Sequence, residues 1–458
     1  MSRRSSIRLA VATATAVSLT GGLLTLATGA ASAVTVPAKY ADDFNGDGYR
    51  DYAHGNRNGQ VVVVYGTATG PGTTTKVFSQ ATSGIPGTAG DAGGYADAFG
   101  EDLAAADLNR DGYADLAVAD FTEKVGDKVS SGAVTILWGR ASGLSGSDAT
   151  RLPKKASTYQ GFGKYLETGD FNGDGRADLA VTNGIDSVYV YRGGFTKSGT
   201  TGSITRHTPN DVLEPTGLVA GRVTNDKATD LFVLGQGYHD DKMTQDAWFL
   251  RGGSTVRAGK VTVINNARPD YSPTGVVADF NKDGYGDLAV SDRTYNRDAG
   301  SVAVWRGGST GPTTKYRITQ ASSGVTTAAS PGDWMGASLS AADTNGDGYP
   351  DLAVGVPGET VSTRKAAGGV HVLRGSRAGL TGVNSQYFSR ATSGVPGAPA
   401  EYEFFGIDVR LRDTDRNGRP DLLVSGDGRD TSLRLPGTSS GITTTGAATV
   451  YVVASFPQ

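Results

Sequence analysis

The sequence predicts an all-β fold, a seven-bladed β-propeller with four strands in each blade, and three observations carry this prediction. An acidic nine-residue motif occurs six times, a short apolar segment follows the motif, and glycine contributes 67 of the 458 residues. Units of about 60 residues with several short strands are typical of propellers, in which radial repetition leaves only short sheet edges. No amphipathic helical pattern follows the N-terminal segment, so helix content should be negligible. A linear β-solenoid is the competing architecture, but its rungs are usually shorter than these units.

The N-terminal segment, residues 1–33, is typical of a secretory signal peptide. An apolar stretch, Leu9–Leu26, follows basic residues, and the small residues Ala31–Ala33 suit cleavage before Val34. A transmembrane helix is the alternative interpretation, but Gly, Ser and Thr interrupt the apolar run. We therefore expect a secreted, extracellular protein whose residues 34–458 form one propeller, with no membrane span.

The amino-acid composition limits what can stabilise the protein and which partners it can have. The chain has no cysteine, so disulfides cannot stabilise it outside the cell, and bound cations could take that role. The formal net charge is −3, which is too acidic for a nucleic-acid partner to be expected.

The acidic motif reads D-x-[DN]-x-[DN]-G-x-x-D and starts at residues 43, 107, 170, 279, 343 and 413. Oxygen atoms at positions 1, 3, 5 and 9 of one turn can converge on a hard cation that takes roughly 6–8 oxygen ligands. The glycine at position 6 lets the backbone fold back, and position 7 should contribute its carbonyl. We expect about six structural Ca²⁺ sites, with these ligands in chain order: Asp43, Asn45, Asp47, Tyr49, Asp51; Asp107, Asn109, Asp111, Tyr113, Asp115; Asp170, Asn172, Asp174, Arg176, Asp178; Asp279, Asn281, Asp283, Tyr285, Asp287; Asp343, Asn345, Asp347, Tyr349, Asp351; Asp413, Asp415, Asn417, Arg419, Asp421.

The residues after each loop exclude an EF-hand, which needs a bidentate glutamate at position 12 and flanking helices. Position 12 is His54 in the first copy and valine in the other five. The segment Asp-Leu-Ala-Val follows in four copies, which is apolar and compatible with a strand. The metal loop is therefore expected to join two strands.

A seventh repeat is hidden in the long gap between the third and fourth loops. Arg222–Asp230 and the apolar Leu231–Leu234 stand where a loop and strand should be. Because Arg222, Thr224 and Lys227 fall at positions 1, 3 and 6, this unit is expected to keep its strand and bind no metal. The seven repeats then start near residues 38, 98, 161, 215, 272, 333 and 404.

Further matched segments complete each unit. An aromatic-Gly step precedes the loop, as in Phe99-Gly100, Phe162-Gly163, Trp334-Met335-Gly336 and Phe405-Gly406. A strand ending in glycine follows it, as in Val61–Gly66, Val134–Gly139, Val188–Gly193, Val302–Gly307 and Val370–Gly375. A fourth segment begins at Phe78, Tyr316 and Phe388, which makes four strands per unit.

These residues resemble the FG-GAP, or VCBS-type, repeats of the integrin α N-terminal propeller, which also occur in bacterial secreted proteins and in glycosylphosphatidylinositol-specific phospholipase D. The FG is Phe99-Gly100 or Phe162-Gly163, and Gly355–Gly358 echoes the GAP. The resemblance implies calcium loops between the first two strands of each blade, all on one face, with ligand binding on the opposite face. It does not extend to an integrin stalk or transmembrane segment, nor to the catalytic domain of the phospholipase.

Catalytic candidates are few, and no enzyme is expected. His54 and His371 lie in structural patterns, and His239 lies in a polar segment of the seventh unit. Gly307–Gly311 matches the G-x-S-x-G nucleophile motif, but that motif must run from a strand into a helix, and here it stands at the turn of the repeat. A calcium-dependent polysaccharide lyase or hydrolase, with an acid–base pair that includes His239 or Asp240, is the alternative function.

The face away from the calcium loops should carry the longer connections, and long loops on a rigid scaffold are where function usually resides. These connections are expected at Gly84–Ala98, Phe121–Ser131, Gly235–Ala247, Ser322–Trp334, Pro357–Gly368 and Gly394–Glu403, with Tyr95, Tyr238, Trp334 and Tyr402 as their best placed aromatic residues. Trp138, Trp248 and Trp305 are expected to pack between blades instead. The leading prediction is a monomeric, calcium-stabilised binding or adhesion module for an extracellular protein or glycan.

Overall fold

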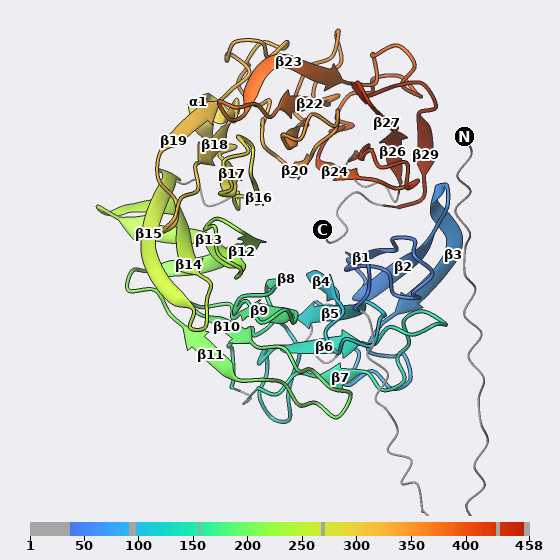
Figure 1. Cartoon of the computed structure of the whole chain (residues 1–458), viewed down its shortest axis with the longest axis vertical. Helices are drawn as coiled ribbons and strands as arrows, with labels where there is room; N and C mark the ends of the chain where they lie inside the picture. Colours follow the sequence, from blue (N-terminus) through green and yellow to red (C-terminus); the bar gives the residue numbers. More distant parts are fainter. Residues whose placement is uncertain (1–36, 91–97, 155–156, 267–270, 427–430, 453–458) are drawn as a thin grey trace, which may run out of the picture. The chain divides into compact units, whose positions relative to one another are not determined.

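The computed structural model describes residues 37–90, 98–154, 157–266, 271–426 and 431–452. The predicted signal peptide and Tyr95 lie outside these ranges, so the expectations for them stay predictions. In the described part, the chain passes through seven antiparallel sheets, here called blades 1 to 7 in chain order (Figure 1). No helix in these ranges is long and apolar enough to cross a membrane.

The strands of the seven blades follow one another along the chain. Blade 1 holds β1 (Tyr52–Asn56), β2 (Gln60–Thr67) and β3 (Gly70–Phe78); blade 2 holds β4 (Leu103–Ala106), β5 (Asp115–Asp120), β6 (Ala133–Leu137) and β7 (Thr150–Arg151); blade 3 holds β8 (Leu166–Gly169), β9 (Asp178–Thr182), β10 (Val188–Tyr191) and β11 (Ile204–His207). Blade 4 holds β12 (Leu213–Gly221), β13 (Asp230–His239), β14 (Lys242–Arg251) and β15 (Arg257–Asn266); blade 5 holds β16 (Gly275–Ala278), β17 (Asp287–Ser291), β18 (Val302–Trp305) and β19 (Lys315–Ile318). Blade 6 holds β20 (Leu339–Ala342), β21 (Asp351–Val356), β22 (Gly369–Arg374) and β23 (Thr381–Phe388); blade 7 holds β24 (Asp408–Arg412), β25 (Asp421–Ser425), β26 (Ser432–Leu435) and β29 (Ala448–Val450), with a small hairpin of β27 (Gly437–Thr438) and β28 (Gly441–Ile442) beside it.

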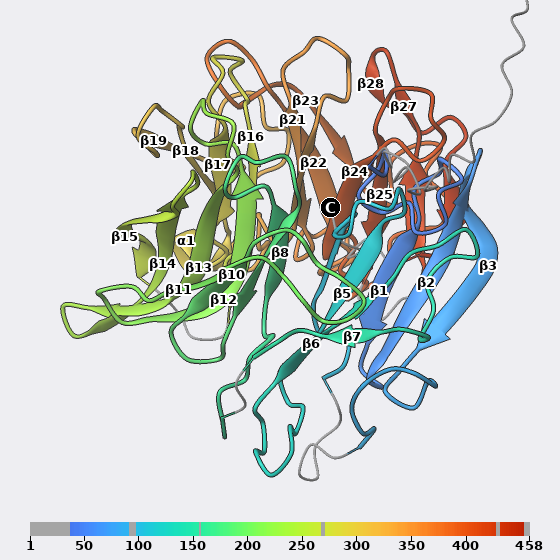
Figure 2. The ribbon, with the colours of Figure 1, turned by 60° about the horizontal axis from the view of Figure 1, so that its bottom comes forward.

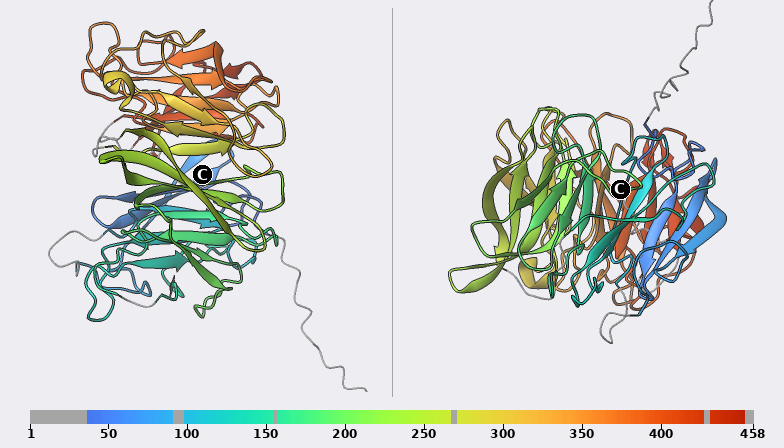
Figure 3. Two further views of the ribbon diagram at one scale, coloured as in Figure 1. Left: turned by 90° about the vertical axis from the view of Figure 1, so that its left-hand side faces the viewer. Right: turned by 90° about the horizontal axis from the view of Figure 1, so that it is seen from below.

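The blades are arranged as a propeller, which confirms the predicted fold. The first strands of neighbouring blades contact one another from β4 to β24, and the later strands of each blade lie progressively outward (Figure 1). Figure 3 shows the same sheets from two further sides, with connections at both ends of the strands. Six blades have the four strands that the repeats predict, and three strands are described for blade 1.

Hydrophobic side chains fill the spaces between the blades, and this packing accounts for the apolar strand patterns. Seven buried clusters each join two adjacent blades. Trp138, Trp248 and Trp305 belong to these clusters and are at most 5% exposed, as their position in the third-strand pattern predicted. Burial of apolar area between blades is therefore the main force that holds the ring together.

The contact between blades 7 and 1 closes the ring and is partly polar. Tyr52 and Val64 pack against Leu423 in a small apolar cluster. Beside it the buried Arg412 forms an ion pair with Asp42. A guanidinium thus supplements a smaller apolar contact at the point where the two ends of the repeat array meet.

The aromatic-Gly step has a defined structural role before the first strand of a blade. Phe162 is 1% exposed in the cluster between blades 2 and 3. Gly163 has a φ of 88°, and a Cβ at this position would lie 2.5 Å from the carbonyl oxygen of Ala133. Only glycine fits such a close backbone approach at positive φ.

The helix content agrees with its prediction, whereas one predicted connection does not. Negligible helix is confirmed, since the only helix among the described residues is the four-residue α1 (Tyr295–Asp298), which contains left-handed residues. The expected long connection Gly235–Ala247 is wrong, because β13 and β14 continue through it (Figure 2). Asp240 and Asp241 join these strands in a two-residue turn with φ of 48° and 58°, and aspartate tolerates this conformation better than most residues. Tyr238 consequently lies in a strand.

Candidate metal loops and their surroundings

The six acidic loops occupy equivalent places in the propeller. Five of them connect the first and second strands of blades 2, 3, 5, 6 and 7, and the loop of blade 1 directly precedes β1. Because the blades share one strand order, all six loops lie at the same end of the inner strands. The expected strand-to-strand placement is confirmed for the five loops of blades 2, 3, 5, 6 and 7, and all six loops lie on one face of the ring.

Each loop is organised by hydrogen bonds between its own oxygen ligands and its own amides. In the first loop the main-chain N–H groups of Asp47 and Gly48 donate to Asp43 Oδ1 and Oδ2 at 3.1 and 2.8 Å. The Asn45 side chain accepts from the Asp47 amide at 3.0 Å, and the Tyr49 amide donates to Asp47 Oδ1 at 2.8 Å. The same pattern recurs in the other loops, from position 1 at Asp107, Asp170, Asp279, Asp343 and Asp413. One contact differs, because Asp343 Oδ1 accepts from the Gly346 amide and not from that of Asp347. The predicted ligands at positions 1, 3 and 5 are thus held around one tight turn.

The aspartate at position 9 lies beneath the loop and ties it to the rest of the blade. Asp115 is 0% exposed, and its two oxygens accept main-chain N–H groups of Leu108 at 3.0 Å and Gly139 at 2.9 Å. The first of these residues is position 2 of the loop, and the second follows the third strand. Asp51, Asp178, Asp287, Asp351 and Asp421 all accept the equivalent glycine amide. Position 9 therefore has a structural role that does not require a metal.

The degenerate loop of blade 4 keeps the structural role of position 9 without the first acidic ligand. Its contacts also show that the predicted alignment of this loop with the motif is wrong by one residue. Asp230 Oδ1 accepts the Gly252 amide at 2.9 Å, as at every other position 9. Its Oδ2 accepts both the amide and the hydroxyl of Thr224, at 2.7 and 2.9 Å. Thr224 thus takes the place of position 2, not position 3, because this loop is one residue shorter. Val223, not Arg222, then stands where the others have their first aspartate.

The oxygen donors of the six intact loops fit a hard cation. Asp287 Oδ2 is buried and has no hydrogen-bond partner among the described residues. Burial, with smaller contributions from Asp283 and Asp279, raises the pKa of Asp287 to about 6. Burial likewise raises the pKa of Asp51 to about 7. A dication beside these carboxylates would relieve both their desolvation and their mutual repulsion.

Acidic side chains by themselves do not form a complete metal cage at these loops. Across the described ranges, no three Asp, Glu or His side chains are grouped as such a cage would require. Two of the five predicted ligands of most loops are an asparagine amide and a main-chain carbonyl, and the position-1 carboxylate accepts loop amides. Calcium at these loops therefore stays a prediction.

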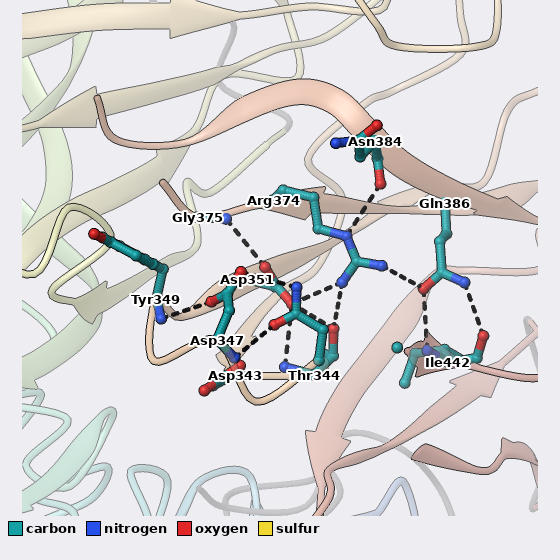
Figure 4. Close-up of polar contacts among 12 residues, drawn as sticks. Asp343, Thr344, Asp347, Tyr349, Asp351, Arg374, Gly375, Asn384, Gln386 and Ile442 are labelled. Atoms are coloured by element: carbon teal, nitrogen blue, oxygen red, sulfur yellow. Dashed lines mark hydrogen bonds and ion pairs between the residues drawn. The ribbon is translucent and has the colours of Figure 1, made fainter. Parts of the chain in front are cut away.

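The position-9 aspartates of blades 6 and 7 differ from the others, because each faces an arginine. Figure 4 shows Arg374 beside Asp351, with Nη1 at 2.8 Å from Asp351 Oδ2. Thr344, at position 2, also donates its hydroxyl to that oxygen. In blade 7, Arg434 Nε lies 2.9 Å from Asp421 Oδ2. Sequence reasoning missed both arginines, which lie on the third strand and outside the motif.

The inner strands enclose a central cavity of about 700 Å³ that carries ionisable side chains. His54 lines it as part of β1, together with Asp102, Glu167 and Arg410. Burial raises the pKa of Asp102 to about 7 and that of Glu167 to about 8, the latter with help from the Asp102 carboxylate. The cavity therefore holds two carboxyl groups that bind protons near neutral pH.

Two further histidines, His371 and His239, occupy structural positions. His371 is fully buried in β22, and its Nε2 lies 2.8 Å from Thr327 Oγ1. Burial lowers the pKa of His371 to about 4. His239 Nε2 lies 2.8 Å from Oδ2 of the buried Asp246 on the neighbouring strand. This pair lies on the hairpin of blade 4, away from the cavity-lining residues.

A row of aromatic side chains crosses the connections that precede the inner strands of blades 5, 6 and 7. The Trp334 ring lies 6.1 Å from that of Tyr271 and 5.8 Å from that of Phe404, with which it is nearly parallel. Tyr402, 61% exposed, continues the row at 6.2 Å from Phe404. Arg293 lies over the Tyr271 and Trp334 rings at 4.5 and 5.2 Å. We call Tyr271, Trp334, Phe404 and Tyr402 the aromatic row.

The aromatic row lies opposite the acidic loops. Its members precede β16, β20 and β24, whereas the loops follow these strands. Trp334 and Tyr402 were predicted on this face, whereas Tyr271 and Phe404 were missed. Phe404 could have been recognised as the aromatic residue before the step Phe405-Gly406, where Trp334 stands in blade 6.

Comparison with known proteins agrees with this architecture. The FG-GAP-like repeat model matches residues 43–118, 107–181 and 170–233, and the FG-GAP repeat model matches residues 335–373. The chain is 30% identical over 153 residues to phosphatidylinositol-glycan-specific phospholipase D of Rattus norvegicus, covering 32% of this chain and 17% of that protein. It is 30% identical over 164 residues to integrin alpha-5 of Xenopus laevis, covering 34% and 14%, and 37% identical over 106 residues to integrin alpha-6 of Gallus gallus, covering 22% and 10%. The matched segments thus span less than a fifth of each relative.

Proposed function

This chain belongs to the FG-GAP repeat proteins, and from that premise we propose that it is a secreted, calcium-stabilised propeller that binds an extracellular protein or glycan. The signal-like N-terminal segment supports secretion, and the lack of cysteine gives bound cations a stabilising role. The likeness to integrin alpha chains supports a binding or adhesion role.

Calcium is supported by the repetition of one donor arrangement. All six loops hold acidic or amide oxygens at positions 1, 3 and 5 around the same turn, above a buried aspartate at position 9. A donor set made only of oxygen atoms suits Ca²⁺ better than a transition metal. Since the donor arrangement is the same in all six intact loops, the cations are proposed to be structural, not catalytic.

The aromatic row is the single observation that carries the binding proposal. It spans three blades and lies on the face opposite the acidic loops, where the longer connections Ser322–Trp334, Pro357–Gly368 and Gly394–Glu403 are placed. Tyrosine and tryptophan combine a large apolar face with a polar group and dominate binding energy at many interfaces. Arg293, stacked on two of the rings, adds a donor for hydroxyl or carbonyl oxygens.

Replacing Trp334 and Tyr402 together by alanine is expected to weaken ligand binding at least about thirtyfold, the effect of losing roughly 2 kcal/mol at a hot spot. The mature protein is first screened on a glycan array and against extracellular proteins, and the ligand found is then titrated against both forms. Tyr238→Ala is the matched control, because Tyr238 is 53% exposed but lies on the hairpin of blade 4. Equal affinities for the double variant and the wild type would contradict the assignment of the aromatic row.

A second candidate function, a polysaccharide lyase or hydrolase, is favoured by the central cavity. Asp102 and Glu167 could act as an acid–base pair there, because their raised pKa values suit proton transfer near neutral pH. His239 and Asp240, which the sequence suggests for this role, are not among the residues that line that cavity. A screen of the secreted protein against polysaccharides tests this candidate: cleavage that Glu167→Gln abolishes would favour it over the binding module.

A further inference from the structure

We infer that Arg374 and Arg434 act as built-in competitors of calcium, so that the loops of blades 6 and 7 bind calcium more weakly than those of blades 1, 2, 3 and 5. This inference rests on the proposed calcium function and concerns how affinity is graded among the six loops. It is drawn from the contacts of the two guanidinium groups with predicted ligands.

In blade 6 the guanidinium of Arg374 is fixed at the position-9 carboxylate. Nη1 donates to Asp351 Oδ2 at 2.8 Å and to Thr344 Oγ1 at 2.7 Å (Figure 4). On its other side, Nη2 donates to Gln386 Oε1 at 3.0 Å and Nε to the Asn384 carbonyl at 3.1 Å. The arginine side chain is 11% exposed and that of Asp351 0%, so solvent screens this pair little.

In blade 7 the guanidinium of Arg434 bridges two predicted ligands. Nε donates to Asp421 Oδ2 at 2.9 Å, and Nη2 donates to Asp415 Oδ2 at 2.5 Å. Asp421 and Asp415 are positions 9 and 3 of this loop. Arg434 therefore lies on the side of the loop where both carboxylates would contact a bound cation.

Blade 4 shows a comparable arginine in a loop that has lost its first acidic ligand. Arg251 directly precedes Gly252, as Arg374 precedes Gly375, and its Nη2 lies 3.1 Å from Asp226 Oδ2. A guanidinium thus accompanies a loop carboxylate where no metal is expected. In blades 6 and 7 an arginine contacts a loop carboxylate in the same way, but the loop keeps its complete set of oxygen ligands.

The other four loops have no such arginine contact among the described residues. Tyr65 and Trp138 stand at the position of Arg374 in blades 1 and 2. In blade 3, Arg192 stands there but donates Nη2 to the Ser254 carbonyl at 2.5 Å. In blade 5, Arg306 donates to the Ala378 carbonyl. Both arginines reach toward the next blade, and neither forms an ion pair with its own loop in the described ranges; the Arg306 charge lowers the pKa of Asp287 only as its smallest influence.

The expected consequence follows from ligand charge. Calcium affinity depends on the net charge of the ligands and on the rigidity of the loop. A guanidinium in contact with the position-9 carboxylate offsets its charge and repels an arriving dication. We expect the loops of blades 6 and 7 to bind calcium at least about tenfold more weakly than the other four.

Competition with a chromophoric chelator of known affinity measures this grading on the calcium-loaded full chain. The wild type should show four tighter and two weaker sites. Arg374→Gln and Arg434→Gln should each move one site from the weaker to the tighter class. Arg192→Gln is the matched control, because Arg192 has the same place in its blade but contacts no ligand, and it should change neither class.

Loop variants assign the classes even if an arginine variant fails to fold. Asp343→Asn should remove a weaker site, and Asp107→Asn should remove a tighter one. Six equivalent sites, or loss of a tighter site in Asp343→Asn, would overturn the inference and leave the calcium proposal standing. If the protein binds no calcium at all, the proposed calcium function is overturned, and the inference with it.

Discussion

Removal of calcium is expected to lower the Tm of the mature protein by roughly 10–20 °C. Each site that binds only the folded chain contributes about 2.7 kcal/mol when free calcium is about 100 times its Kd. The chain has no disulfide to offset this loss, and the freed carboxylates would repel one another within each loop. Calorimetric scans in excess calcium and in excess chelator measure the effect.

The control for this prediction is magnesium, which prefers a rigid octahedral site and should restore little of the lost stability. A Tm that excess chelator leaves unchanged would contradict a stabilising role for calcium. Readdition of calcium should return the Tm to its original value, which separates metal loss from irreversible damage.

Replacing the position-9 aspartate is expected to destabilise a blade whether or not calcium is present. Asp230→Ala should lower the free energy of unfolding by about 3 kcal/mol, because three donors would lose their acceptor in a buried site. Since the loop of blade 4 is expected to bind no metal, chelator should not change this cost. Urea unfolding with and without calcium measures it.

The matched variant is Asp279→Ala at position 1 of the loop in blade 5. Its carboxylate accepts two loop amides, and its main predicted role is to hold calcium. We expect a cost of about 2–3 kcal/mol in calcium that largely disappears in chelator. An Asp230→Ala variant as stable as the wild type would contradict the structural role assigned to position 9.

The propeller was predictable because the repeated motif marks the same turn in successive blades. Matching segments around that turn identify the strands. Apolar residues of these strands, such as Val118 and Leu179, pack between adjacent blades. The hairpin of blade 4 was not predictable from this pattern, because its strands are longer than those of other blades and continue through a polar segment. Only the left-handed turn at Asp240 and Asp241 reveals it.

The arginine contacts at the loops depend on side-chain direction, which repeat alignment does not contain. Arg192, Arg306 and Arg374 all directly precede the glycine that follows a third strand. Only the last of them turns toward its own loop, where Thr344 and Asn384 provide further partners. The shortened loop of blade 4 was misaligned for a related reason, since Thr224 resembles no motif position until its contact with Asp230 is known.

Calcium at the six acidic loops is the central claim, and anomalous diffraction from crystals grown in calcium tests it most directly. The account predicts anomalous peaks inside the loops of blades 1, 2, 3 and 5, weaker peaks in blades 6 and 7, and no peak in blade 4. A well-ordered propeller whose loops show no anomalous signal under these conditions would contradict it.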